Sequence, residues 1–442
     1  MNCVKWCLAV SVAAMKPASR IEATIAILQR DSEIGVPLDA CVGDYMRQRR
    51  YIGAKDRNDV SARVYEIARN QAKICWWLDR LKAEDTPRNR VMTWLAIGEQ
   101  ADLKRLKDLF DGSKYAPEVL SDKEEELAKK LVGKSLFHTD MSEAVLVECP
   151  PEYEQALRKI FGDGFEDEMK AMQAPATLDL RVNIFLTERE IVQKMLAKDD
   201  VETTETPFSP WGLRCEKKSY LAKTKAMNKG LIEIQDEGSQ LISYLADAKP
   251  GMQVLDYCAG AGGKTLALAA AMQRKGRIVA MDTEAKRLEN GRRRYKKAHL
   301  ADIIEVRPLS DQKHRKWLRR QKGTFDLVLT DVPCSGTGTW RRNPDMKWRH
   351  YGPSLDELIA VQAEIMDKVA HTLKVGGKFV YATCSLLPQE NEEQIEKFLK
   401  NHPEFEVQPL DEALGLGSPF MRLTPLRHST DGFFAAVLVR KN

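Results

Sequence analysis

From residue 235 onward, the chain alternates between apolar runs of strand length and helical segments. The runs are Val254 to Tyr257, Ile278 to Met281, Ile303 to Val306, Phe325 to Thr330 and Lys378 to Ala382. Strands that are apolar along their whole length are buried on both faces, and the helices between them serve as crossover connections. The alternation therefore predicts a doubly wound α/β domain over residues 235–442, with a largely parallel sheet between two layers of helices.

The part of the chain before residue 235 has a different pattern. Residues 17–147 show helical periodicity without strand signals, which predicts an all-helical domain. Pro150-Pro151 interrupts that pattern. Residues 148–234 combine helices with a strand-like alternation from Thr177 to Phe185, so we expect a small α/β module there.

The nine cysteines include no Cys-x-x-Cys pair and have no regular spacing. Structural zinc sites and disulfide frameworks normally show one or the other, so we expect free thiols, no metal and a cytoplasmic protein. No apolar run reaches the ~20 residues that span a bilayer, so no membrane partner is expected. Residues 1–16 contain only a short apolar stretch after Lys5 and are expected to be a disordered leader.

A glycine-rich turn follows the first apolar run and reads Asp-Tyr-Cys-Ala-Gly-Ala-Gly-Gly-Lys-Thr from Asp256 to Thr265. Such a turn lets the backbone approach a ligand and aims a helix N-terminus at it. A Walker A loop would need glycine at Cys258, and the dinucleotide fingerprint would need glycine at Thr265. Neither phosphate-binding motif is therefore present.

Acidic residues near the ends of the first three strands favour S-adenosylmethionine as the cofactor. Asp256 precedes the turn and can hold the amino end of a methionine moiety. Asp282 ends the second strand, where a carboxylate accepts both ribose hydroxyls, and Asp311 follows the third strand, where it can meet an adenine amino group.

Two cysteine motifs follow the fourth and fifth strands. Asp331-Val-Pro-Cys334 and Thr383-Cys384 should meet beside the cofactor, because ligands bind at the carboxyl edge of such sheets. A thiolate that adds to carbon 6 of cytosine makes carbon 5 nucleophilic, and an acid such as Asp331 can assist at ring nitrogen 3. The pattern favours methylation of cytosine at carbon 5, although the spacing does not decide which cysteine attacks.

These motifs, with Asn391-Glu392 and Asp431-Gly-Phe-Phe434, resemble the RsmB/Sun-type RNA (cytosine-5) methyltransferases from about Thr177 to the C-terminus. The resemblance implies a Rossmann-like methyltransferase sheet, with Cys384 as the nucleophile, Cys334 for product release and Asp331 near the base. The predicted cofactor-binding residues are Asp256, Cys258, Ala259, Gly260, Ala261, Gly262, Gly263, Lys264, Asp282, Arg287, Asp311 and Asp331.

One departure from the family pattern lies in the glycine-rich turn. The family commonly has Cys-Ala-Ala-Pro-Gly-Gly-Lys-Thr, whereas Gly260 and Ala261 here replace the Ala-Pro pair. Proline restricts the backbone and glycine frees it, so the sequence predicts a looser turn.

RNA is the expected partner, with ribosomal RNA favoured, transfer RNA possible and no obligate protein partner evident. Leu38 to Val64 is similar to the NusB-like RNA-binding domain that precedes bacterial members of the family, so residues 17–147 and 148–234 are both predicted to bind RNA. Basic clusters on the catalytic domain should contact phosphates, and two tryptophans should stack on unpaired bases. These are Lys286-Arg287, 292–297, 313–322, Arg341-Arg342 and Lys347 to Arg349, with Trp340 and Trp348.

Two other functions remain open from the sequence. Asp331-Val-Pro-Cys334 distantly echoes the Asp-Pro-Pro-Tyr motif of exocyclic amino methylation, a chemistry that Cys384→Ala would spare. The chain could instead be a non-catalytic RNA-binding or ribosome-assembly factor with a relict cofactor site, which would not bind S-adenosylmethionine.

Overall fold

The computed structural model describes residues 14–217, 219–349 and 351–441, so most of the predicted leader lies outside the described residues. The leader's last residues are described, and the backbone N–H of Met15 donates to Asp56 at 2.9 Å. Contacts divide the chain into two compact units. The first comprises residues 1–173 and 343–351, and the second comprises residues 174–342 and 352–442.

The first unit is helical, in agreement with the sequence pattern. Its helices are α1 (Pro17–Ile34), α2 (Leu38–Gln48), α3 (Ala54–Arg69), α4 (Gln71–Arg80), α5 (Pro87–Thr93), α6 (Leu103–Leu109), α7 (Asp122–Leu131), α8 (Glu143–Leu146), α9 (Pro151–Phe161) and α10 (Phe165–Ala171). A π-helical turn η1 (Trp94–Gly98) follows α5 directly. Apolar residues at helical spacing, including Val60, Val64 and Ile67, are buried in one core.

A segment from the middle of the catalytic sequence, Asn343 to Tyr351, completes this helical unit. It contains the short helix η6 (Pro344–Lys347), whose Asp345 accepts the Leu38 backbone N–H at 3.0 Å. Arg349 forms an ion pair with Asp31 at 3.0 Å. Polar contacts to buried groups therefore hold the segment within the helical unit.

The second unit begins with a four-stranded antiparallel sheet of order β2-β3-β1-β4. Its strands are β1 (Leu178–Val182), β2 (Thr203–Glu205), β3 (Gly212–Cys215) and β4 (Ile232–Ile234). The helices α11 (Arg189–Ala197) and α12 (Lys225–Asn228) and the turn η3 (Leu221–Lys223) lie between them in sequence. The domain prediction assigned α9 and α10 to this module, whereas their contacts group them with the helical unit.

The main sheet has the order β10-β12-β9-β8-β5-β6-β7, with β11 paired to β12. Its strands are β5 (Gln253–Asp256), β6 (Arg277–Asp282), β7 (Ile304–Pro308), β8 (Phe325–Asp331), β9 (Leu373–Thr383), β10 (Phe405–Val407), β11 (Met421–Leu423) and β12 (Phe433–Arg440). The pairings from β7 to β9 are parallel, and those of β10, β11 and β12 are antiparallel. The predicted α/β fold is thus confirmed, and the antiparallel edge was not predicted.

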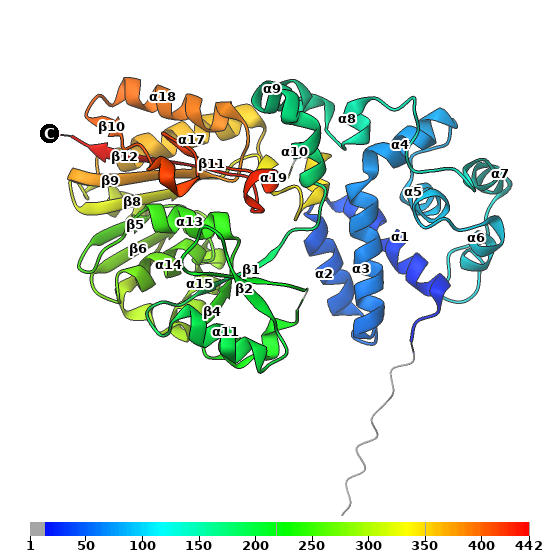
Figure 1. The fold of residues 1–442 in the computed structure, drawn as a ribbon, viewed down its shortest axis with the longest axis horizontal. Coiled ribbons are helices and arrows are strands. Elements are labelled where there is room, and N and C mark those ends of the chain that lie inside the picture. The colour runs from blue at the N-terminus through cyan, green and yellow to red at the C-terminus, as the bar shows by residue number, and fades with distance from the viewer. Residues whose placement is uncertain (1–13, 218, 350, 442) are drawn as a thin grey trace, which may run out of the picture. The chain divides into compact units, whose positions relative to one another are not determined.

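Helices cover both faces of the main sheet (Figure 1). One face packs against α13 (Glu237–Leu245), α14 (Gly263–Ala271) and α15 (Ala285–Lys297). The other packs against α16 (Gln312–Arg319), α17 (Leu355–Ala370) and α18 (Glu392–Asn401). The remaining helical segments are η4 (Ala301–Ile303), η5 (Thr337–Thr339), η7 (Pro388–Glu390), η8 (Glu412–Leu414) and α19 (Pro425–His428).

The strand order reverses between β5 and β8, which are parallel neighbours whose connections lead to opposite sides of the sheet. Ligands of open α/β sheets bind in the crevice at the carboxyl ends of such strands. The glycine-rich turn after β5 and the cysteine motif after β8 both begin at this point. Within the described residues, no helix is long and apolar enough to cross a membrane.

Candidate active site

The two predicted catalytic cysteines lie side by side at the carboxyl edge of the main sheet. Asp331 at the end of β8 is in register with Ala382 of β9, so the loops that follow the two strands start together. Cys334 and Cys384 extend from these loops, and their sulfur atoms are 3.4 Å apart. The distance permits a hydrogen bond in which one thiol donates to the other sulfur.

The environment of Cys334 favours its neutral form. The hydrogen bond with Cys384, followed by burial, raises the pKa of the Cys334 thiol well above its ordinary value. A thiol that remains protonated at neutral pH can donate a proton but is a poor nucleophile. Cys334 is therefore suited to proton transfer.

Asp331 connects the cysteine loop to the glycine-rich turn. Its carboxylate accepts a hydrogen bond from the Lys264 ammonium at 2.7 Å. Lys264 belongs to the first turn of α14 and is nearly buried, whereas a third of the Asp331 side chain is exposed. The ion pair thus links the residue at which the Cys334 loop begins to the glycine-rich turn.

A cavity of about 150 Å³ lies over the glycine-rich turn. Most of the predicted cofactor-binding residues line it: Asp256, Cys258, Ala259, Gly260, Ala261, Gly263, Lys264, Arg287 and Asp331. Gln235 and Ser239, which were not predicted from the sequence, also line it. The cavity therefore joins the turn to the catalytic strand through Asp331.

Asp256 presents a buried, unsatisfied acceptor at this cavity. Its Oδ2 accepts a hydrogen bond from the Thr265 hydroxyl at 2.6 Å, whereas its buried Oδ1 has no hydrogen-bond partner. Burial raises the pKa of Asp256 to about 7. A buried carboxylate oxygen without a partner is costly, so a cationic or N–H donor from a ligand would fit here.

The glycine-rich turn is held by several hydrogen bonds, in contrast to the predicted looseness. Gly260 and Gly262 have φ angles of 56° and 81°, which other residues rarely adopt. Arg294 donates to the Ala261 carbonyl at 2.6 Å, and Arg181 donates to the Gly263 carbonyl at 2.5 Å. Two arginines from outside the turn thus fix its backbone without the proline.

Asp282 and Asp311 do not line the cavity. Asp282 accepts the backbone N–H groups of Gly260 and Glu284, each at 2.8 Å, and so supports the turn from behind. Asp311 is exposed and caps α16 by accepting the Lys313 backbone N–H at 2.8 Å. The roles that these contacts establish are structural, and cofactor contact by either residue stays a prediction.

Part of the predicted RNA-contacting set is wrong. Trp340 is fully buried and cannot stack on a base without unfolding of its surroundings. Arg341 and Arg342 both form ion pairs with Asp236 and Asp431, and Arg341 is buried whereas Arg342 is about a third exposed. The basic residues of α15 and α16 are different, since most of them are exposed: Lys286, Arg287, Arg292, Arg293, Lys296, Lys297, Lys313, Arg315, Lys316 and Arg319.

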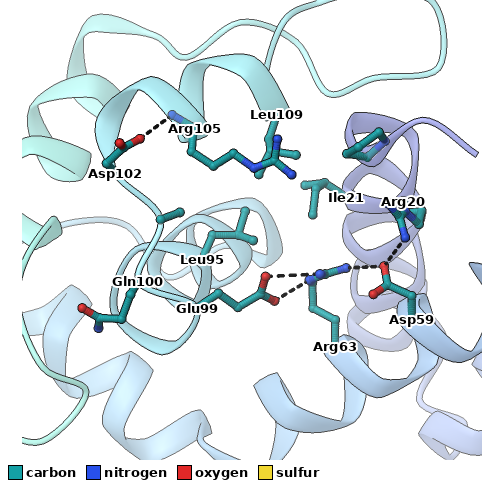
Figure 2. Close-up of a pocket in the computed structure, with 12 residues that line it drawn as sticks. Arg20, Ile21, Asp59, Arg63, Leu95, Glu99, Gln100, Asp102, Arg105 and Leu109 are labelled. Atoms are coloured by element: carbon teal, nitrogen blue, oxygen red, sulfur yellow. Dashed lines mark hydrogen bonds and ion pairs between the residues drawn. The ribbon is translucent and has the colours of Figure 1, made fainter.

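The helical unit has a cavity of its own, of about 510 Å³ (Figure 2). Figure 2 shows Arg63 between Asp59 and Glu99, to which it forms ion pairs at 3.1 and 2.6 Å. The charged side chains that line this cavity thus largely neutralise one another, and none of them was predicted as a site residue. Across the described ranges of the chain, no cluster of three or more metal-ligating side chains is found.

Comparison with known protein families gives two matches. Residues 243–439 match the family described as 16S rRNA methyltransferase RsmB/F. Residues 153–221 match the RsmF/B-like ferredoxin-like domain. The two matched regions together include β1, β2 and β3 of the antiparallel module and the main sheet as far as residue 439 in β12, whereas β4 lies between them.

Curated relatives and a solved structure agree with these matches. The chain is 32% identical over 269 residues to the probable ribosomal RNA small subunit methyltransferase B of Synechocystis, covering 59% of this chain and 60% of that protein. It is 33% identical over 262 residues to ribosomal RNA small subunit methyltransferase B of Yersinia pseudotuberculosis, covering 59% of each. The chain thus spans about three fifths of the length of these relatives. The crystal structure of the protein PH0851 is 27% identical with a TM-score of 0.78, covering 97% of this chain and 100% of that one.

Proposed function

We propose that this chain, which belongs through residues 243–439 to the RsmB/F methyltransferase family, transfers a methyl group from S-adenosylmethionine to carbon 5 of a cytosine in RNA. Small-subunit ribosomal RNA is the proposed substrate, because the curated relatives carry that substrate in their names. Cys384 is the proposed nucleophile, and Cys334 and Asp331 are the proposed proton-handling groups.

The observation that carries this proposal is the 3.4 Å separation of the two sulfurs, which follow the ends of the neighbouring strands β8 and β9. Methylation of an exocyclic amino group has no use for a pair of cysteines. Carbon 5 of cytosine, by contrast, must first be activated by a nucleophile that adds to carbon 6. A neutral thiol next to that nucleophile is then available for the later proton transfer.

The proposed sequence of steps begins with Cys384 as a thiolate. Its sulfur forms a bond to carbon 6, and the electron pair of the 5,6 double bond moves so that carbon 5 becomes nucleophilic. Asp331 assists at ring nitrogen 3 during the addition by passing on a proton from the Lys264 ammonium that it contacts. Later the Cys334 thiol gives its proton to the Cys384 sulfur as the sulfur–carbon bond breaks, and Cys334 takes the proton from carbon 5 as the 5,6 double bond is restored. The net result is transfer of one proton from carbon 5 to Cys384 through Cys334.

The cavity over the glycine-rich turn fits S-adenosylmethionine, whose sulfonium supplies the electrophilic methyl group when it is bound. Asp256 would accept hydrogen bonds from its ammonium through the unpartnered Oδ1. Gly260 and Gly262 let the turn pack closely against its own neighbours, because a side chain at Gly260 would meet Arg287 and one at Gly262 would meet Tyr295. Lys264 keeps Asp331 at the boundary between cofactor and base.

The test is methyl transfer to small-subunit ribosomal RNA and to transfer RNA, each read by nucleoside mass spectrometry. The full chain should form 5-methylcytosine, and Cys384→Ala should reduce the rate at least ~10³-fold, as expected when a covalent nucleophile is removed. Cys75→Ala, a half-exposed cysteine of the helical unit, serves as the matched control. Loss of ribosomal RNA methylation at one cytosine in a deletion strain would identify the natural substrate.

The division of labour between the cysteines has its own test. Cys334→Ala should form the bond to carbon 6 but release product slowly, so a protein–RNA adduct should appear on a denaturing gel when cofactor is added. Cys384→Ala should give no such band. A product methylated on an amino group, or full activity of Cys384→Ala, would contradict the proposal. RNA binding without any binding of S-adenosylmethionine would point to a non-catalytic factor.

A further inference from the structure

Behind the two cysteines lies a buried glutamate, Glu390, at the end of η7. Its side chain has no solvent exposure. Oε1 accepts the Ser335 backbone N–H at 2.8 Å and the Gln362 amide N–H at 2.9 Å, and Oε2 accepts the Ser335 hydroxyl at 2.5 Å. No basic side chain of the described residues forms an ion pair with it. Glu390 is thus a carboxylate held by neutral donors.

The donors to Glu390 connect it directly to the Cys334 loop. Ser335 follows Cys334 in sequence and gives Glu390 both its backbone N–H and its hydroxyl. Gln362 of α17 donates to Glu390 and also to the carbonyl of Pro333, the residue before Cys334. Both neighbours of Cys334 are therefore fixed through groups that contact this one carboxylate.

A second set of hydrogen bonds connects the same point to the Cys384 loop. The Ser335 and Ser385 hydroxyl oxygens are 3.2 Å apart, and Ser385 follows Cys384. Thr337 accepts the Leu386 backbone N–H at 2.9 Å and lies 3.2 Å from the Ser385 hydroxyl. The short distance between the two sulfurs is therefore maintained by a network that is anchored on Glu390.

The charge of Glu390 also acts on the Cys334 sulfur. The pKa of Cys334 is raised first by the hydrogen bond with Cys384, then by burial and the charge of Cys384, and then by the charge of Glu390. A negative charge in a site of low dielectric opposes formation of a second one nearby. Glu390 therefore opposes ionisation of Cys334, whose loop it holds.

We propose that Glu390 is a positioning residue that holds the two cysteine loops together and keeps Cys334 as a thiol, so that the two neighbouring sulfurs take different parts in the reaction. This inference deepens the proposed function and rests on it for its catalytic meaning. Two equivalent thiols at 3.4 Å would compete for ionisation and for the base. A fixed charge beside one of them removes that equivalence.

The experiment measures alkylation of each cysteine by iodoacetamide between pH 6 and pH 10, with peptide mass spectrometry to separate Cys334 from Cys384. In the unmodified chain, Cys384 should be labelled first and Cys334 only at higher pH. Glu390→Gln keeps the size of the side chain and removes its charge. It should lower the pH midpoint for Cys334 and so raise its labelling rate at least about threefold at a pH below both midpoints.

Two further variants separate charge from a general structural effect. Glu390→Asp keeps the charge and should restore the high midpoint of Cys334. Glu396→Gln removes an exposed carboxylate from the neighbouring helix α18 and should leave both midpoints unchanged. In a methyl-transfer assay, Glu390→Gln should lower kcat at least about tenfold while the Kd of S-adenosylhomocysteine stays within about twofold.

Several outcomes would overturn the inference. Labelling of Cys334 before Cys384 in the unmodified chain would contradict it without any variant, so a misfolded Glu390→Gln would leave it testable. An unchanged Cys334 midpoint in a folded Glu390→Gln, or an equal shift in Glu396→Gln, would also contradict it. Because alkylation needs neither RNA nor methyl transfer, these outcomes are distinct from failure of the proposed function.

Discussion

Arg181 of β1 should control cofactor affinity although it contacts only protein groups. Its guanidinium is buried and donates to the Gly263 carbonyl at 2.5 Å and to the Gln235 side-chain oxygen. Gly263 is the first residue of α14, whose N-terminus faces the cavity. Arg181→Met removes both hydrogen bonds and keeps an unbranched side chain of similar length. The turn should then lose a restraint while the fold is retained.

The magnitude follows from two opposing effects. Hydrogen bonds from a charged donor contribute roughly 1.5–3 kcal/mol each, so two are worth about 3–6 kcal/mol. Burial lowers the pKa of Arg181 from its ordinary value to about 10, which corresponds to a cost of about 3 kcal/mol for the charged form. The net contribution to unfolding free energy is therefore only about 0–3 kcal/mol. Loss of order at one backbone residue of the turn costs about 1–2 kcal/mol on binding, or about tenfold in Kd.

The assay is isothermal titration calorimetry with S-adenosylhomocysteine, together with thermal unfolding. Arg181→Met should weaken binding about tenfold and lower Tm by no more than about 8 °C. Arg189→Met removes an arginine of the same module that pairs with Glu205 away from the turn, and it should leave Kd unchanged. The reasoning would be refuted if Arg181→Met bound the ligand with the original Kd, or if Arg189→Met weakened binding equally.

Three other predictions concern pH, stability and RNA. Because burial raises the pKa of Asp256 to about 7, the free protein should lose stability as pH rises from about 4 to 7. Affinity for a cationic ligand should instead increase as pH rises through about 7, because the carboxylate is then ionised. Asp256→Asn should abolish both trends in pH titrations. Glu148→Ala leaves Lys73 as an unpaired buried cation and should cost about 3–5 kcal/mol in urea unfolding, whereas Glu143→Ala at an exposed pair should cost less than about 1 kcal/mol. Arg293→Ala on α15 should weaken RNA binding similarly for all sequences and reduce the slope of log K against log salt by about one, and an unchanged slope would exclude a phosphate contact there.

The catalytic domain could be predicted well because its signals are local. Each predicted strand of the parallel sheet is a continuous apolar run, and the structure contains β5 to β9 at the predicted positions, with β9 starting earlier at Leu373. The proximity of the two cysteines could be predicted, because the carboxyl ends of parallel strands lie at one edge of a sheet. The antiparallel strand β12 lies outside the alternation of strands and helices, so the sequence pattern did not predict it.

The supporting charges could not be predicted, because their partners are distant in sequence. Asp179 and Arg181 of β1 alternate with apolar residues, as does Asn183 directly after the strand, and they look like the solvent face of a strand, yet all three are buried. Arg181 reaches Gly263 and Asn183 reaches Ala298, at separations of 82 and 115 residues. The sequence showed only three polar side chains at alternate positions in and just after a short strand, and their tertiary partners are needed to show that they are internal.

The basic residues around Trp340 illustrate the opposite error. Arg341 and Arg342 follow the cysteine motif and suggested a cationic surface, but Asp236 and Asp431 neutralise both. A run of arginines gives charge but not exposure, and the acidic partners lie 105 and 90 residues from Arg341. The same limitation applies to Lys347, which is almost completely buried.

The placement of residues 343–351 in the helical unit has a consequence for biosynthesis. A ribosome delivers the N-terminal helices first, and domains usually fold as they emerge. Here the contacts of Leu38 and Asp31 cannot form until Asp345 and Arg349 have been translated, which happens only after β8 and the Cys334 loop. The N-terminal helices should therefore remain only partly protected on the nascent chain until most of the catalytic domain has been made.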